Sequence, residues 1–160
     1  MESASLPLDF KPLIGTDEAT IDDKGRILFS KKKRDRLGKD FAIVVTKRGC
    51  LAAYPEHMWK RVQNEVNAYH MSNEGRDQYT RLFFGMAEDE LNFDAQGRVV
   101  IPQKMREIGK LKKDVLLVGA FDRVEIWAVE EYEKFLADPK GYGQERCQSF
   151  AAAYEEMAGR

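Results

Sequence analysis

A pairing that can orient an arginine for recognition, Asp-x-x-Gly-Arg, occurs twice in this chain. The copies are 22–26, read as Asp-Asp-Lys-Gly-Arg, and 94–98, read as Asp-Ala-Gln-Gly-Arg. Glycine allows the positive φ of a tight turn, and the aspartate can accept bonds from the turn amides. An arginine held there presents a planar fork of donors that suits O6 and N7 of guanine in the major groove. The alternative is that Arg26 forms a structural ion pair, with Asp22 or with Asp94.

Basic residues are denser after the first copy than after the second. Residues 24–36 contain seven lysines and arginines against one acid, whereas residues 96–108 contain three against one. The formal net charge of −1 therefore hides a local cationic cluster. The predicted DNA-binding residues are Lys24, Arg26, Lys31, Lys32, Lys33 and Arg34. Arg26 would read bases and the three lysines after Ser30 would bind phosphates, unless that run is only a solvated surface.

The other polar residues do not assemble into a catalytic or metal-binding pattern. Cys50 and Cys147 have no CxxC spacing, and His57 and His70 have no ligands at metal-binding spacing. The motif aspartates have no second carboxylate placed for acid–base chemistry. No apolar run approaches the roughly 20 residues needed to span a bilayer. We expect no enzyme, cofactor, metal, small-molecule substrate or membrane, and the cysteine usage indicates the cytoplasm.

The two motifs belong to a tandem duplication of a larger unit. They lie 94 − 22 = 72 residues apart, and similar elements follow each of them. The first copy predicts strands at 18–22 and 26–29 around a tight turn, a helix at 31–37, and strands at 41–46 and 50–54. The second copy predicts a short helix after Pro102 and strands at 115–119 and 124–127.

Apolar residues spaced by three and four predict helices after Pro55, around 79–86, and near the C-terminus at 147–157. The expected organisation is an irregular segment at 1–17, a first repeat at 18–71, a helical linker at 72–90 with an acidic end, a second repeat at 91–137, and a helical tail at 138–160. Units of about 50 residues bury too little surface alone. The two repeats should therefore share a core.

The repeated signature resembles that of the MraZ family. Asp22-x-Lys24-Gly25-Arg26-Ile27 with Arg34 returns as Asp94-x-Gln96-Gly97-Arg98-Val99-x-Ile101-Pro102 with Arg106. The resemblance implies an α+β fold in which two tandem SpoVT/AbrB-type swapped-hairpin units share one small β-barrel flanked by helices. Its structural motif residues would be Asp22, Gly25, Asp94, Gly97 and Arg98. The chain departs from the family pattern at Ser30, where proline is usual, and at Lys33, where an aromatic residue is usual.

The resemblance also implies a function. The expected protein is a transcriptional regulator of the cytoplasm and nucleoid that binds double-stranded DNA as a ring-shaped homo-oligomer. Its sites would be short G-rich direct repeats upstream of the cell-division and cell-wall gene cluster. Two alternatives stay open. One is an oligomeric protein-interaction module without DNA contact, whose acidic C-terminal third docks a basic partner, and the other is an AbrB-type antitoxin.

Overall fold

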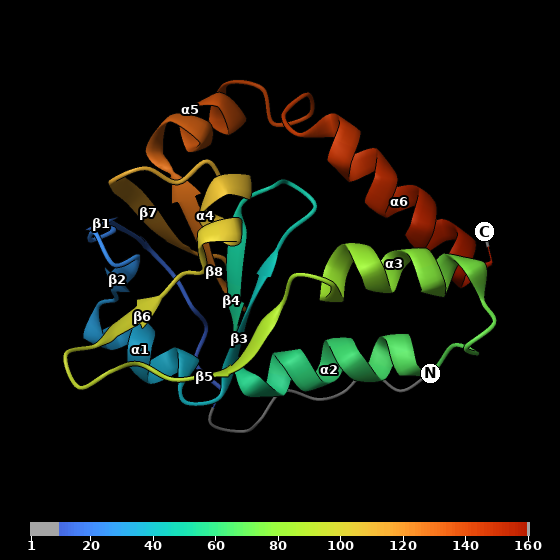
Figure 1. The fold of residues 1–160 in the computed structure, drawn as a ribbon, viewed down its shortest axis with the longest axis horizontal. Coiled ribbons are helices and arrows are strands. Elements are labelled where there is room, and N and C mark those ends of the chain that lie inside the picture. Colours follow the sequence, from blue (N-terminus) through green and yellow to red (C-terminus); the bar gives the residue numbers. More distant parts are fainter. Residues whose placement is uncertain (1–9, 160) are drawn as a thin grey trace.

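Strands from both repeats contribute to one six-stranded antiparallel sheet (Figure 1). In this computed structural model, which describes residues 10–159, the strand order is β1 (Thr16–Thr20), β7 (Asp114–Gly119), β8 (Val124–Ala128), β4 (Leu51–Tyr54), β3 (Phe41–Val45) and β5 (Glu88–Leu91). β1 pairs with β7 and β4 pairs with β8, so strands of the first repeat bond to strands of the second. The sheet therefore needs both repeats.

A short two-stranded ribbon joins the two Asp-x-x-x-Arg motifs. β2 (Arg26–Leu28) pairs antiparallel with β6 (Arg98–Val100), and Ile27 lies opposite Val99. Side chains alternate between the faces of a strand, and Ile27 and Val99 are both buried in the core. The outward face of the ribbon therefore carries Arg26, Leu28, Arg98 and Val100.

The predicted strand-turn-strand around Gly25 is present, but its strands β1 and β2 do not pair as a hairpin. β1 bonds to β7, β2 bonds to β6, and an isolated bridge joins Ile21 to Ile27. The two repeats cross instead. The Phe29 amide donates to the Gly97 carbonyl (3.1 Å), and the Ile101 amide donates to the Gly25 carbonyl (2.8 Å). Each ribbon strand therefore ends beside the turn of the other repeat, which is the swapped arrangement.

Two short helices complete the core on the side of the ribbon. α1 (Lys31–Leu37) follows β2 and α4 (Gln103–Ile108) follows β6. Leu37 and Met105 from these helices pack into one cluster with residues of both repeats. The helix predicted at 31–37 is confirmed, and it begins where the Ser30 side chain accepts a bond from the Lys33 amide. In the second repeat Pro102 precedes the helix, as expected.

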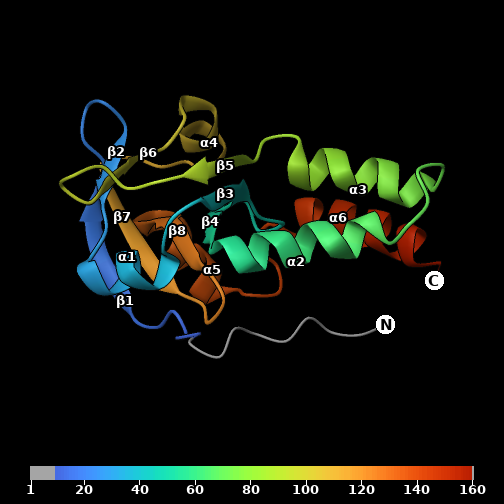
Figure 2. The ribbon, with the colours of Figure 1, turned by 90° about the horizontal axis from the view of Figure 1, so that it is seen from below.

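The remaining helices cover the outer face of the sheet. α2 (Glu56–Asn67), α3 (Glu74–Phe84) and α6 (Gln144–Ala158) stand away from the ribbon, and α3 packs along α6 (Figures 1 and 2). Trp59, Phe83 and Phe150 from these helices form a second cluster on Ala42, Val44 and Ala52 of the sheet. α5 (Val129–Ala137) packs against β7 and β8 near Trp127. No helix within residues 10–159 is long and apolar enough to cross a membrane.

Two segments differ from the sequence-based expectation. β1 begins at Thr16, inside the segment 1–17 expected to be irregular, of which residues 1–9 lie outside the described part of the chain. The acidic end of the expected linker contributes the edge strand β5, which pairs with β3 across a register shift. Three of its four residues are acidic, so no apolar alternation announced a strand.

Candidate nucleic-acid interface

The first motif holds its arginine at one edge and leaves the other edge open. The Oδ2 atom of Asp22 accepts a bond from Nε of Arg26 (2.7 Å), while Oδ1 accepts the amides of Lys24 (3.0 Å) and Arg26 (2.9 Å). Neither terminal nitrogen of Arg26 has a hydrogen-bond partner among residues 10–159. The side chain is 26% exposed. The turn therefore fixes the guanidinium while leaving its terminal donors available.

The second motif has the same turn but ties its arginine more fully. Asp94 accepts bonds from the amides of Gln96 and Arg98 (both 2.9 Å) and from Nε of Arg98 (3.0 Å). In addition, Nη2 of Arg98 donates to Oε1 of Gln96 (3.2 Å). Lys24 occupies the matching position of the first repeat and has no acceptor to offer. The two arginines therefore differ in how many donors remain for a ligand.

Hydrogen bonding to the turn also keeps both aspartates ionised. The pKa of Asp22 lies below its ordinary value, chiefly because the Arg26 amide donates to the carboxylate. The pKa of Asp94 is lowered in the same way by the amide of Arg98. Bonds to the charged form of a carboxylate favour that form. Near neutral pH each carboxylate is therefore an anionic acceptor that orients an arginine.

Each turn glycine also receives an arginine from the other repeat. A Cβ atom at Gly97 would lie 2.6 Å from Cζ of Arg34, and one at Gly25 would lie 2.9 Å from Cζ of Arg106. Both glycines have positive φ, +84° and +79°. The Nε atoms of the two arginines are buried without a hydrogen-bond partner in the described structure. Arg34 therefore packs at the second turn, as part of a reciprocal lock between the repeats.

Lys33 does not fit its predicted role as a phosphate-binding residue. It is 4% exposed, and its Nζ atom donates to Oδ2 of Asp17 (2.9 Å) and to the Ile14 carbonyl (3.2 Å). The same position in the second repeat is Met105, which is also buried. The helix turns this position inward, so Lys33 anchors β1 to α1.

The other two lysines of the run stay at the surface. Lys31 and Lys32 are exposed on α1, and Lys31 pairs with Asp35 (2.8 Å). They line a hollow of about 790 Å³ together with Lys11, Arg36 and three further residues. Because of the crossing, α1 starts beside the second turn, and these lysines are not the immediate neighbours of the Arg26 turn.

The Arg26 turn instead receives cations that the sequence analysis missed. Ile21, Asp22, Arg106, Lys112 and Lys113 are among the residues lining a hollow of about 370 Å³ beside this turn. The Ile21 amide donates to the Lys113 carbonyl (2.8 Å), which fixes that proximity. Lys112 pairs with Glu130 (3.1 Å). The repeat offset pairs Arg106 with Arg34, but only the crossing reveals that each arginine reaches the opposite turn.

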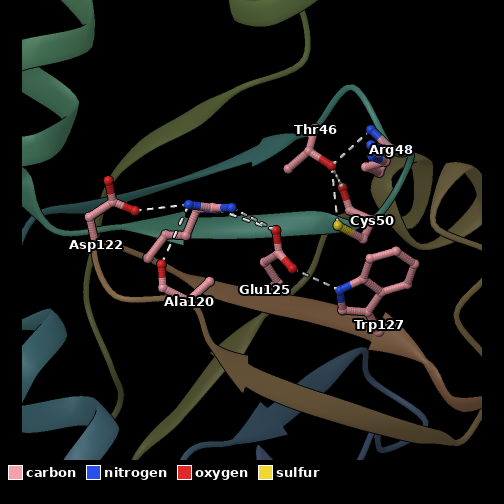
Figure 3. A network of polar contacts seen from close by, with 8 residues as sticks. Thr46, Arg48, Cys50, Ala120, Asp122, Glu125 and Trp127 are labelled. Atoms are coloured by element: carbon pink, nitrogen blue, oxygen red, sulfur yellow. Dashed lines mark hydrogen bonds and ion pairs between the residues drawn. The ribbon is translucent and has the colours of Figure 1, made fainter. Parts of the chain in front are cut away.

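A second polar cluster, on the outer face of β8, is fully paired and structural. Figure 3 shows Glu125 directed toward Trp127, whose Nε1 atom donates to it (3.1 Å). The other Glu125 oxygen accepts from Arg123, which also donates to Asp122 (2.9 Å). At the neighbouring turn the Thr46 hydroxyl donates to the Cys50 carbonyl, and burial raises the pKa of the Cys50 thiol to about 12. Residues 10–159 contain no group of acids, histidines and cysteines placed to hold a metal ion.

Two copies of one hairpin-and-helix unit, crossed over a common core and exposing an arginine ribbon, define a duplicated swapped-hairpin protein. Family comparison agrees with this class. Residues 13–82 and 83–156 each match the family model described as "MraZ protein, putative antitoxin-like". The chain belongs to the MraZ family, so the resemblance seen in the sequence is confirmed.

Similar proteins extend this relationship over most of the chain. A protein named Transcriptional regulator MraZ from Carboxydothermus hydrogenoformans is 36% identical over 91% of this chain and 93% of its own length. The protein of that name from Heliobacterium modesticaldum is 34% identical over 91% of this chain and 93% of its own length. That from Salinispora arenicola is 36% identical over 78% of this chain and 87% of its own length.

Proposed function

We propose that this protein is a sequence-specific DNA-binding transcriptional regulator that acts in the cytoplasm on the nucleoid. Its targets are short G-rich direct repeats upstream of the cell-division and cell-wall gene cluster, and it binds them as a ring-shaped homo-oligomer. Family membership and the name carried by the relatives support regulation of transcription. The ribbon supplies the reading element, since the major groove admits a two-stranded β-ribbon.

The observation that carries the proposal is the state of Arg26. Its Nε atom is held by Asp22, and its terminal nitrogens are open among the described residues. A held guanidinium loses little further freedom on binding, and its fork matches O6 and N7 of guanine. Lys24, Lys31, Lys32 and Lys113 surround the ribbon as candidate phosphate contacts, which position the protein without reading sequence.

A ring-shaped assembly gives this small interface enough affinity. The protein has a net charge of −1, so bulk attraction to DNA is weak and binding depends on the local patch. Copies joined in a ring convert each additional contact into an intramolecular event at high effective concentration. Direct repeats spaced to match adjacent subunits would then be bound together, whereas a single repeat would be bound weakly.

A gel-shift titration on the DNA upstream of the protein's own gene tests the proposal. Arg26→Ala should weaken binding to that DNA by about 5- to 150-fold, the equivalent of about 1–3 kcal/mol for one guanine contact. Arg81→Ala is the matched control, because Arg81 is an exposed, ion-paired arginine on α3, away from the ribbon. Light scattering should show the same assembly for both variants.

Salt and sequence controls complete the test. Binding should fall steeply as salt rises, and replacing the guanines of the repeats should reduce binding by the wild type but not by Arg26→Ala. A protein that shows no salt-sensitive shift on upstream DNA, or that tolerates Arg26→Ala as well as Arg81→Ala, is not the regulator proposed. The first result would favour the protein-interaction module.

A further inference from the structure

Two aliphatic side chains on the outward face of the ribbon have no packing role inside the protein. Leu28 is 56% exposed and Val100 is 53% exposed, whereas their strand neighbours Ile27 and Val99 are buried. They occupy matching positions in the two repeats, since 28 + 72 = 100. A large aliphatic residue exposed at the same place in both copies, beside an arginine proposed to read DNA, is a candidate contact.

The ribbon register places each aliphatic side chain opposite an arginine. Arg26 faces Val100 across the strands, and Leu28 faces Arg98. Side chains directly opposite in an antiparallel pair have Cβ atoms about 5 Å apart. The two mixed pairs are two residues apart along the ribbon, or about 7 Å, which matches two base steps at about 3.4 Å each. The outward face therefore repeats an arginine–aliphatic pair at the spacing of DNA bases.

Thymine is the base whose major-groove edge carries an apolar group, the C5 methyl. We infer that Leu28 and Val100 contact the C5 methyl groups of thymines adjacent to the guanine read by Arg26, and thereby add thymine specificity to the DNA site. This inference rests on the proposed function and names a further part of the sequence that the ribbon reads.

The surrounding charge favours DNA over a protein partner as the occupant of this face. An apolar protein surface pressed on Leu28 and Val100 would also cover the guanidinium groups beside them without supplying acceptors, and an unpaired buried charge is costly. The major groove offers base acceptors and phosphates within the same contact. The mixed face is therefore complementary to a groove in which guanine and thymine are neighbours.

Replacing thymine with uracil tests the inference because it removes the C5 methyl and changes nothing else. The probe is a short duplex recovered by selection from a random library with the full-length wild-type protein. Uracil is then placed at one thymine at a time, and dissociation constants are measured. Loss of one buried methyl should weaken wild-type binding by about fourfold at the contacted positions.

Protein variants assign each methyl to its side chain. Leu28→Ala should bind the thymine duplex about as weakly as the wild type binds the uracil duplex, and should be insensitive to uracil at that position. Val100→Ala should lose sensitivity at a different position. Leu136→Ala is the matched control, because Leu136 is 58% exposed on α5 and lies outside the ribbon. It should keep the full response to uracil.

The outcomes separate this inference from the function on which it rests. If salt-sensitive, guanine-dependent binding persists but uracil has no effect at any position, or if Leu28→Ala and Val100→Ala keep the wild-type response, the inference is wrong and the regulator stands. If either variant changes the assembly in light scattering and leaves the uracil response intact, this face contacts a second copy, and the inference is again wrong. If selection recovers no duplex, the proposed function itself fails.

Discussion

Replacing Gly97 with alanine should destabilise the protein more than any purely local strain can explain. Gly97 has φ +84°, and an alanine there would incur about 1–2 kcal/mol for a left-handed backbone. Its Cβ would also lie 2.6 Å from Cζ and 2.9 Å from Cδ of Arg34, so this side chain must leave its place between the repeats. Overpacking of this kind costs about 1–3 kcal/mol. The expected total is about 2–5 kcal/mol.

Three comparisons isolate the contact between repeats. Gly15 has a similar φ of +80°, and nothing lies within 4 Å of the place that a Cβ would occupy, so Gly15→Ala should show the backbone strain alone. Gly25→Ala should fall between the two, because its nearest contact is 2.9 Å from Arg106. Urea unfolding followed by circular dichroism, at one fixed protein concentration, gives the free energies of unfolding.

A double-mutant cycle with Arg34→Ala provides the refutation. The excess cost of Gly97→Ala should disappear when Arg34 is already truncated, because the two positions couple only through this contact. If Gly97→Ala costs the same as Gly15→Ala, or keeps its excess cost without Arg34, the reciprocal lock does not stabilise the fold.

Two further predictions concern buried groups. Lys33→Met, which copies Met105 of the second repeat, should unfold within about 1 kcal/mol of the wild type or be more stable, because a buried charge is replaced by a packed apolar side chain; Lys33→Ala should lose about 2 kcal/mol to a cavity. The pKa of Asp17 is lowered chiefly by the bond from Lys33, so wild-type stability from this pair is present above the ordinary aspartate range and lost as pH falls through the lowered value. Acid unfolding monitored by fluorescence should show a weaker pH dependence in Lys33→Met, and an unchanged one would contradict this. Because the pKa of Cys50 is raised to about 12 by burial, iodoacetamide at pH 8 should label Cys147 before Cys50, and equal labelling in peptide mass spectra would be inconsistent with that burial.

Local patterns predicted the elements well and their partners poorly. The helix at 31–37 and the two turns follow from capping residues, glycines and the repeat offset, all of which act within a few residues. Pairing between β2 and β6 depends on segments 72 residues apart and leaves no local signal. Lys33 shows the same limit. Between two exposed lysines it looked like part of a solvated run, and only its alignment with Met105 carried a sign of burial.

Duplication within one chain allows the two ends of the ribbon to differ, and this difference bears on the proposed DNA site. Gln96 ties a terminal nitrogen of Arg98, whereas Lys24 at the matching position leaves Arg26 open and adds a charge. Two identical chains would present two equal ends, and a symmetric reader suits a palindrome. A ribbon with unequal ends defines a direction along the groove. Subunits arranged head to tail in a ring would each read in that direction, which is the orientation that direct repeats require.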